Sequence, residues 1–186
     1  MKWLRVLGLS TAVMLLSGCL ITTNSDSDEL DSDWAVECAD EEPEVHINAF
    51  GDLELPCLGD KENTSLGIFD GQPMLIALWA SWCGPCHEEA PHLQAFTELA
   101  DGHVRVLGVD SEDQADAARA FAEEYDWTFP SVFDENGQVR KSLGIMGLPG
   151  IALVDADGSV VHVINETGIT TDDLVDAANT HFDVSL

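Results

Sequence analysis

Two cysteines three residues apart are the most reactive feature of the sequence. Cys83 and Cys86 flank a Gly-Pro dipeptide in the stretch LIALWASWCGPCHEEAP. Three kinds of chemistry use such a pair: a metal clamp, a structural disulfide, or a dithiol that exchanges electrons with other proteins. Exchange needs one activated sulfur that attacks and a second sulfur within reach that releases the product.

The expected start of a helix at the pair favours exchange. A helix is predicted from about Gly84 to Leu99, directly after an apolar strand, with the proline of the pair in its first turn. The N-terminus of a helix carries partial positive charge and unpaired N–H groups, which favour a thiolate. We therefore predict that Cys83 is the exposed attacking sulfur and that Cys86 faces inward as the resolving thiol. Trp82 is expected to pack beside the pair and to limit solvent access.

A metal site is the main chemical alternative. A structural zinc ion needs four ligands, usually two such pairs or added histidines, so His87 or His92 would have to turn inward. Because soft thiolates favour Cu(I), a copper-binding metallochaperone without turnover stays open. We expect the histidines to be packed or solvated, and we expect no resident metal or other cofactor.

Residues 1–18 are typical of a secretory signal. A positively charged head precedes an apolar run that is too short to span a membrane, and small residues follow. The ending LSGC resembles the lipobox of bacterial lipoproteins, which implies cleavage before Cys19 and a lipid on its thiol. The alternative is an ordinary signal peptide that contains a cysteine. Residues 19–35 are predicted to be an acidic flexible tether, and residues 36–186 the folded domain.

The remaining cysteines predict two disulfides. With Cys19 assigned to lipid, four cysteines allow three pairings. Cys83 and Cys86 are already neighbours, so the economical arrangement also joins Cys38 to Cys57. An exported chain sits where disulfides persist. We interpret the Cys38–Cys57 bond as structural, with a second exchangeable redox pair as the alternative.

The apolar pattern predicts an α/β domain. Residues 44–47 and 52–57 are expected to form a hairpin. Buried strands are expected in 73–81 and 104–110, a helix with a serine cap in 111–126, a hairpin in 151–164 and a closing helix in 170–182. This order predicts a mixed central sheet flanked by helices.

The charge balance excludes one class of function. The chain has 35 acidic and 7 basic residues among 186, a net charge of −28. Nucleic-acid binding is therefore not expected, because phosphate would be repelled. The acidity favours solubility, with docking of a basic partner as the alternative.

Three segments carry a resemblance to a known family. WASWCGPCHEEAP resembles the active site of the thioredoxin superfamily, and most closely that of the exported TlpA/ResA-type thiol-disulfide oxidoreductases. YDWTFPSVFDENGQV resembles the helix–strand insertion of this branch, and GLPGIALVDADGSVV resembles its cis-proline segment. The resemblance runs from about Glu44 to the C-terminus. It implies a thioredoxin fold with an N-terminal β-hairpin and this insertion.

The resemblance also implies roles for three residues. Pro149 matches the cis-proline beside the dithiol, which keeps metal away from the cysteines, and the backbone of Leu148 would pair with the substrate chain. Glu89 matches a buried glutamate that moves protons to and from the sulfurs. Two positions depart from relatives. Ala77 stands where plain thioredoxin has a buried aspartate, and Gly150 follows the proline where many relatives have threonine.

The implied function is disulfide reduction in exported proteins, in the setting of cytochrome c maturation. An oxidising compartment would require a membrane thiol-reductant protein as electron donor, and the lipid on Cys19 would hold the monomeric protein at the membrane. The alternative direction is an oxidase that donates disulfides. A peroxidase-like activity is disfavoured, because LWASWC lacks the threonine that this branch places before its reactive cysteine.

Overall fold

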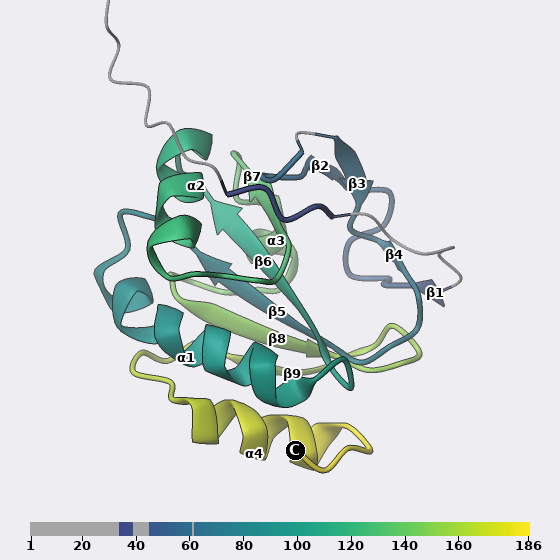
Figure 1. Cartoon of the computed structure of the whole chain (residues 1–186). Helices are drawn as coiled ribbons and strands as arrows, with labels where there is room; N and C mark the ends of the chain where they lie inside the picture. The colour runs from purple at the N-terminus through teal and green to yellow at the C-terminus, as the bar shows by residue number, and fades with distance from the viewer. Residues whose placement is uncertain (1–33, 39–44, 61) are drawn as a thin grey trace, which may run out of the picture.

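The computed structural model describes residues 34–38, 45–60 and 62–186 (Figure 1). The predicted signal, Cys19 and nearly all of the tether lie outside these residues. Within them, no helix has both the length and the apolar character needed to cross a membrane.

A five-stranded mixed sheet forms the centre of the domain. Its strands are β5 (Met74–Trp79), β6 (Arg105–Ser111), β7 (Ser131–Asp134), β8 (Gly150–Val154) and β9 (Val160–Ile164), in the order β7-β6-β5-β8-β9. Strands β5, β6 and β7 are parallel, whereas β8 is antiparallel to both of its neighbours. The predicted mixed sheet is confirmed. The segment implied to be an insertion supplies β7 at the sheet edge.

Helices cover the two faces of the sheet unequally. Residues of α1 (Gly84–Ala100), α2 (Ala115–Glu124) and α4 (Thr171–His181) share one apolar cluster with Leu75 and Trp79 of β5. In Figure 1, α1 and α4 lie side by side. Alternate residues of β5, such as Ile76, face a second cluster with the short helix α3 (Gln138–Ser142) and the N-terminal strands. Burial on both faces explains why β5 is apolar throughout.

The predicted pairing of residues 44–47 with residues 52–57 in an N-terminal hairpin is wrong. Strand β1 (Val45–His46) pairs with β4 (Ile68–Phe69), and β2 (Glu54–Pro56) pairs with β3 (Asn63–Ser65). The chain between β1 and β2 makes successive turns, in which the N–H of Phe50 donates to Ile47 and that of Leu53 donates to Phe50. Each of the two strands thus pairs with a strand that lies later in the chain.

The Cys38–Cys57 disulfide covers the edge of the sheet at β7. The predicted bond is present, with Cα atoms 5.8 Å apart. Cys57 forms an isolated bridge with Val132 of β7, and the N–H of Leu58 donates to the carbonyl of Ser131 at 2.8 Å. The disulfide thus fastens to the sheet a segment that pairs with an otherwise open edge.

The packed domain begins earlier than composition predicts. Trp34 is 8% exposed, and its Nε1 donates to the carbonyl of Trp127 at 2.8 Å. The domain therefore includes Trp34, two residues before the predicted boundary at residue 36. A single aromatic side chain can bury enough surface to dock an otherwise polar segment.

The expected serine cap of α2 is also wrong. Ser111 is the buried last residue of β6, and α2 begins four residues later, after Gln114. Between them, Glu112 has a positive φ of 58° and turns the chain away from the sheet.

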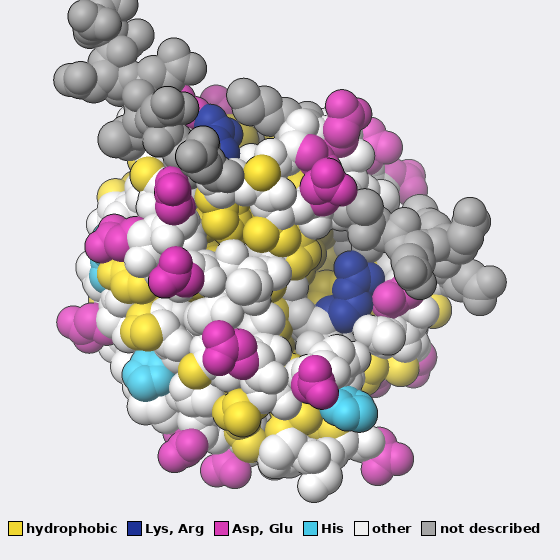
Figure 2. Space-filling view, viewed as in Figure 1, with side chains coloured by type: hydrophobic (Ala, Val, Ile, Leu, Met, Phe, Trp, Pro, Cys, Tyr) yellow, Lys and Arg dark blue, Asp and Glu magenta, His cyan; other side chains and the backbone are white. Residues whose placement is uncertain are grey.

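Acidic side chains spread over the face seen in Figure 2, with few basic ones among them.

Candidate redox site

The dithiol lies where β5 ends and α1 begins. Cys83 is the N-cap of α1, and Cys86 lies in its first turn beside the predicted proline. The two cysteines form a disulfide with Cα atoms 5.3 Å apart, and the N–H of Cys86 donates to the carbonyl of Cys83 at 3.0 Å. A Cys83 thiolate formed on reduction would therefore sit at the positive end of a 17-residue helix.

The exposure of Cys83 differs from the prediction, and Trp82 is largely exposed. Cys83 is only 4% exposed and packs with Cys86 in the cluster beneath α1, so the expected exposed sulfur is wrong for this oxidised form. Trp82 is 62% exposed, so much of its own surface is open to solvent. Its Nε1 donates to the carbonyl of Glu112 at 3.0 Å, which fixes the indole to a neighbouring loop.

The loop implied to bind substrate lies in the same cluster as the dithiol. The Leu148–Pro149 peptide bond is cis, as the resemblance implies. Leu148 is half-buried and packs against both apolar clusters, including the one that contains Cys83 and Cys86. Residues 65 positions apart in the chain are thereby brought to one end of the sheet.

Glu89 is buried on the inner face of α1. It lies three residues after Cys86 and is 3% exposed. Its Oε1 accepts hydrogen bonds from the N–H groups of Gly168 at 2.7 Å and Ile169 at 3.2 Å, just before α4. Burial raises the pKa of Glu89, and these two hydrogen bonds act in the opposite direction. The side chain therefore has the burial that the resemblance implies.

A second buried carboxyl group, on Asp110, escaped the sequence reasoning. Asp110 is fully buried on β6 and is the sheet partner of Trp79, four residues before Cys83. Neither of its carboxyl oxygens makes a well-formed hydrogen bond to the described residues. Burial raises the pKa of Asp110 to about 9, and repulsion from Asp113 adds to the effect. The one signal in the sequence was an acidic residue at the end of an apolar strand.

Asp113, the acidic neighbour of Asp110, is hydrogen-bonded to the turn before the dithiol. Its Oδ2 accepts a hydrogen bond from the N–H of Ser81 at 2.5 Å. Ser81 also uses its carbonyl, which lies 2.8 Å from Nε2 of His87. The turn that delivers Cys83 to the helix is thus held from two sides.

The two histidines of α1 are engaged in packing. Nδ1 of His87 lies 2.9 Å from the hydroxyl of Tyr125, and Nδ1 of His92 lies 3.0 Å from Oγ1 of Thr171. The ring of His87 also contacts that of Phe121 edge-on, with centroids 4.7 Å apart. Across the part of the chain that the structure describes, no three His, Cys, Asp or Glu side chains are grouped to hold a metal ion.

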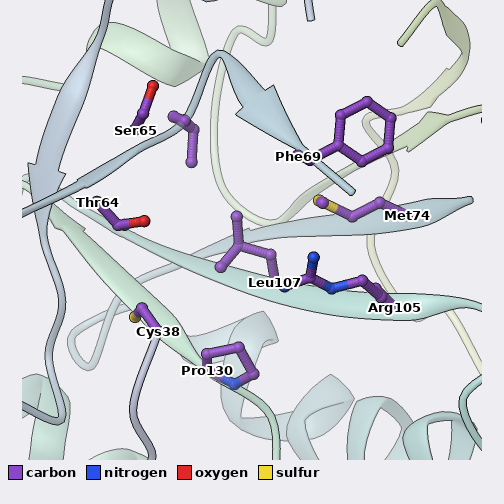
Figure 3. A pocket seen from close by; sticks show the side chains of 9 residues that line it. Cys38, Thr64, Ser65, Phe69, Met74, Arg105, Leu107 and Pro130 are labelled. Atoms are coloured by element: carbon purple, nitrogen blue, oxygen red, sulfur yellow. The ribbon is translucent and has the colours of Figure 1, made fainter. Parts of the chain in front are cut away.

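A small crevice lies away from the dithiol, between the N-terminal strands and β6 (Figure 3). Phe69, Met74 and Leu107 line it, with Cys38 at one side, and Arg105 pairs with Asp70 at 3.2 Å. Its volume of about 20 Å³ is close to that of a single water site. The crevice therefore encloses little more space than one water molecule needs.

Comparisons with known proteins identify the family of the chain. The Redoxin family model matches residues 43–180. The chain is 30% identical over 97 residues to thiol-disulfide oxidoreductase ResA of Bacillus thuringiensis subsp. konkukian, covering 52% of this chain and 56% of the relative. It is 36% identical over 94 residues to thiol:disulfide interchange protein DsbE of Vibrio cholerae, covering 50% of each. The match thus spans about half the length of these curated relatives.

A solved structure matches over a larger part of the fold. The structure of MTB dsbF in its mixed oxidised and reduced forms has a TM-score of 0.63 and 26% identity. The match covers 72% of this chain and 98% of that protein. The chain therefore has a thioredoxin-like fold and belongs to the Redoxin family.

Proposed function

We propose that this protein is a thiol-disulfide oxidoreductase that reduces disulfides in exported proteins, with Cys83 and Cys86 as its redox centre. The observation that carries the proposal is the arrangement at the end of β5. A Cys-Gly-Pro-Cys pair caps a helix and shares one apolar cluster with the loop that bears the cis Leu148–Pro149 bond. Relatives named ResA and DsbE support the same reaction class.

The proposed reaction has two exchange steps. The Cys83 thiolate attacks a substrate disulfide, so a Cys83–substrate bond forms while the substrate S–S bond breaks and one substrate thiolate leaves. The Cys86 thiolate then attacks the Cys83 sulfur, which forms the Cys83–Cys86 bond and releases the second thiolate. Two electrons and, after protonation of both thiolates, two protons have passed to the substrate. A dithiol donor returns them by the reverse steps and becomes a disulfide.

Three further residues have proposed roles in these steps. Glu89 carries protons to and from the sulfurs, because a buried carboxyl with a raised pKa titrates closer to neutral pH. The backbone of Leu148 pairs with the substrate chain beside Pro149. The exposed indole of Trp82 gives the substrate an apolar contact surface.

The proposed setting is the outer side of a cell membrane. Its support is the sequence of residues 1–35: a signal in 1–18, a lipid on Cys19 and an acidic tether. A membrane thiol-reductant protein would supply electrons, and apocytochromes c are the proposed substrates by family resemblance. Cys19→Ser should release the protein from the membrane fraction, and a variant that stays membrane-bound would contradict the lipid anchor.

The reduction potential of the Cys83–Cys86 pair tests the direction of the reaction. Equilibration against redox buffers should give a value near the roughly −270 mV of thioredoxin, as expected for a reductase. A value near the −120 mV or so of a strong oxidant would instead indicate a disulfide donor. Stoichiometric Cu(I) binding without turnover of any disulfide would favour the metallochaperone and contradict the enzyme.

A further inference from the structure

A chain of hydrogen bonds connects the turn before the dithiol to the loop that carries the cis-proline. It begins at Trp82, whose indole N–H donates to the carbonyl of Glu112. Glu112 in turn presents its side chain to α3, where Oε2 accepts from Arg140 Nη2 at 3.1 Å and Nε at 3.3 Å. Glu112 is thus bonded both to Trp82, which lies 30 residues earlier in the chain, and to Arg140 of α3.

The position of Glu112 is tightly specified. Its φ of 58° is uncommon for a residue with a side chain, and its N–H donates to the carbonyl of Asp134 at 3.0 Å. Its carboxylate lies against Gly137, where an added Cβ would approach the Glu112 Cδ to 2.9 Å. A residue larger than glycine at position 137 would therefore displace the acceptor of Arg140.

Arg140 continues the chain to the cis-proline loop. Its Nη1 donates to the carbonyl of Ile145 at 3.1 Å and to that of Met146 at 3.4 Å. The Arg140 side chain is 21% exposed, and its guanidinium binds the carboxylate through two nitrogens and the carbonyls through the third. Only arginine has a planar fork of donors that can serve both partners at once.

Asn165 holds the same loop from its other side. Its Oδ1 accepts from the N–H of Met146 at 3.0 Å, and its Nδ2 donates to the carbonyls of Gly147 and Pro149 at 2.9 Å each. With its backbone held in this way, the loop leaves Met146 88% exposed.

We propose that Arg140 is a positioning residue for thiol-disulfide exchange with polypeptide substrates. Acting through Glu112, it fixes the Trp82–Cys83 turn relative to the Leu148–Pro149 loop, so that a peptide paired with the loop presents its disulfide to Cys83. The inference rests on the proposed function and adds a residue that the site motifs do not contain. A small disulfide needs only the sulfur atoms, so its reaction does not depend on this alignment.

The test compares two oxidants of the reduced protein. In Arg140→Gln, we expect the rate constant for a disulfide-bonded peptide to fall by on the order of tenfold or more, because small misplacements of reacting groups are costly. The rate with oxidised glutathione should stay within about twofold of wild type. Arg140→Lys keeps the charge but not the fork, so it should fall between the two. Arg119→Gln is the matched control, since Arg119 pairs with Asp116 on α2.

A spectroscopic readout separates positioning from general destabilisation. The indole N–H resonance of Trp82 should shift in Arg140→Gln and stay in place in Arg119→Gln. The proposal would be overturned if the rate constant fell equally with both oxidants, or if it did not fall with the peptide. If Arg140→Gln does not fold, the same comparison is made with Arg140→Lys. If the wild-type protein exchanges with neither oxidant, the proposed function falls as well. If the wild-type protein is active and the Arg140 variant reacts at the same rates, only the positioning role is contradicted.

Discussion

We compare the free energy of unfolding of Asp110→Asn with that of wild type. This difference should favour the variant more at neutral pH than at acidic pH. The physical reason is the position of Asp110 on β6, where burial raises its pKa to about 9. At pH 7 this carboxyl group is protonated in the folded protein and ionised in the unfolded chain. Folding must therefore take up a proton from a solution in which protons are scarce.

The size of the effect follows from the pKa values. An ordinary aspartate has a pKa of 3.8, so protonation at pH 7 costs about 1.4 kcal/mol for each of roughly 3 pH units, or about 4 kcal/mol at most. The sign follows from proton uptake: a group with a raised folded pKa loses stability as pH rises through the window from about 4 to about 9. Asparagine binds no proton. The free energy of unfolding of Asp110→Asn, relative to that of wild type, should therefore rise by up to about 4 kcal/mol between pH 4 and pH 7.

Urea unfolding of both proteins at several pH values from 4 to 8.5 measures this difference. The value at pH 4 absorbs any change in packing or hydrogen bonding, because folded Asp110 is then neutral and its partial ionisation in the unfolded chain changes the free energy of unfolding by less than about 1 kcal/mol. Asp176→Asn on the exposed face of α4 is the control for loss of one negative charge. A difference that does not change with pH, or a loss for Asp110→Asn that grows toward pH 7, would refute the reasoning and indicate an ionised, well-partnered Asp110.

Two further variants test the site and its scaffold. Glu89→Gln keeps an oxygen acceptor for Gly168 and Ile169, so the free energy of unfolding should change by less than about 1 kcal/mol. Exchange rates measured by stopped flow should fall at least about tenfold. Unchanged rates would exclude a proton-transfer role for Glu89. Replacing both Cys38 and Cys57 by alanine opens a 19-residue loop and should cost about 3 kcal/mol in urea unfolding with exchange retained, whereas lost turnover would indicate a second redox pair.

Much of the redox site could be predicted because its parts are local in sequence. The strand before the dithiol is an unbroken apolar run, and Pro85 is favoured in a first helical turn directly after Cys83. Glu89 lies one helical turn after Cys86 and so shares its inner face. The hairpin of β8 and β9 and the closing helix α4 follow from equally local signals.

The strand partners at the N-terminus could not be predicted in this way. Residues 44–47 and 52–57 are both extended sequences, and alternation alone does not say which strand each will join. In the structure, β1 pairs with β4 and β2 pairs with β3. Likewise, only packing against Trp127 shows that Trp34 belongs to the domain.

By itself, the sequence determined where the reactive cysteines lie, because strand, turn and helix signals act within a few residues of one another. Only the tertiary structure decided what surrounds them. The burial of Cys83 and Asp110 depends on neighbouring strands and helices, and the bond between Glu112 and Arg140 joins residues 28 positions apart. Burial and long-range hydrogen bonds are properties of the packed chain, since each requires partners that no local pattern specifies.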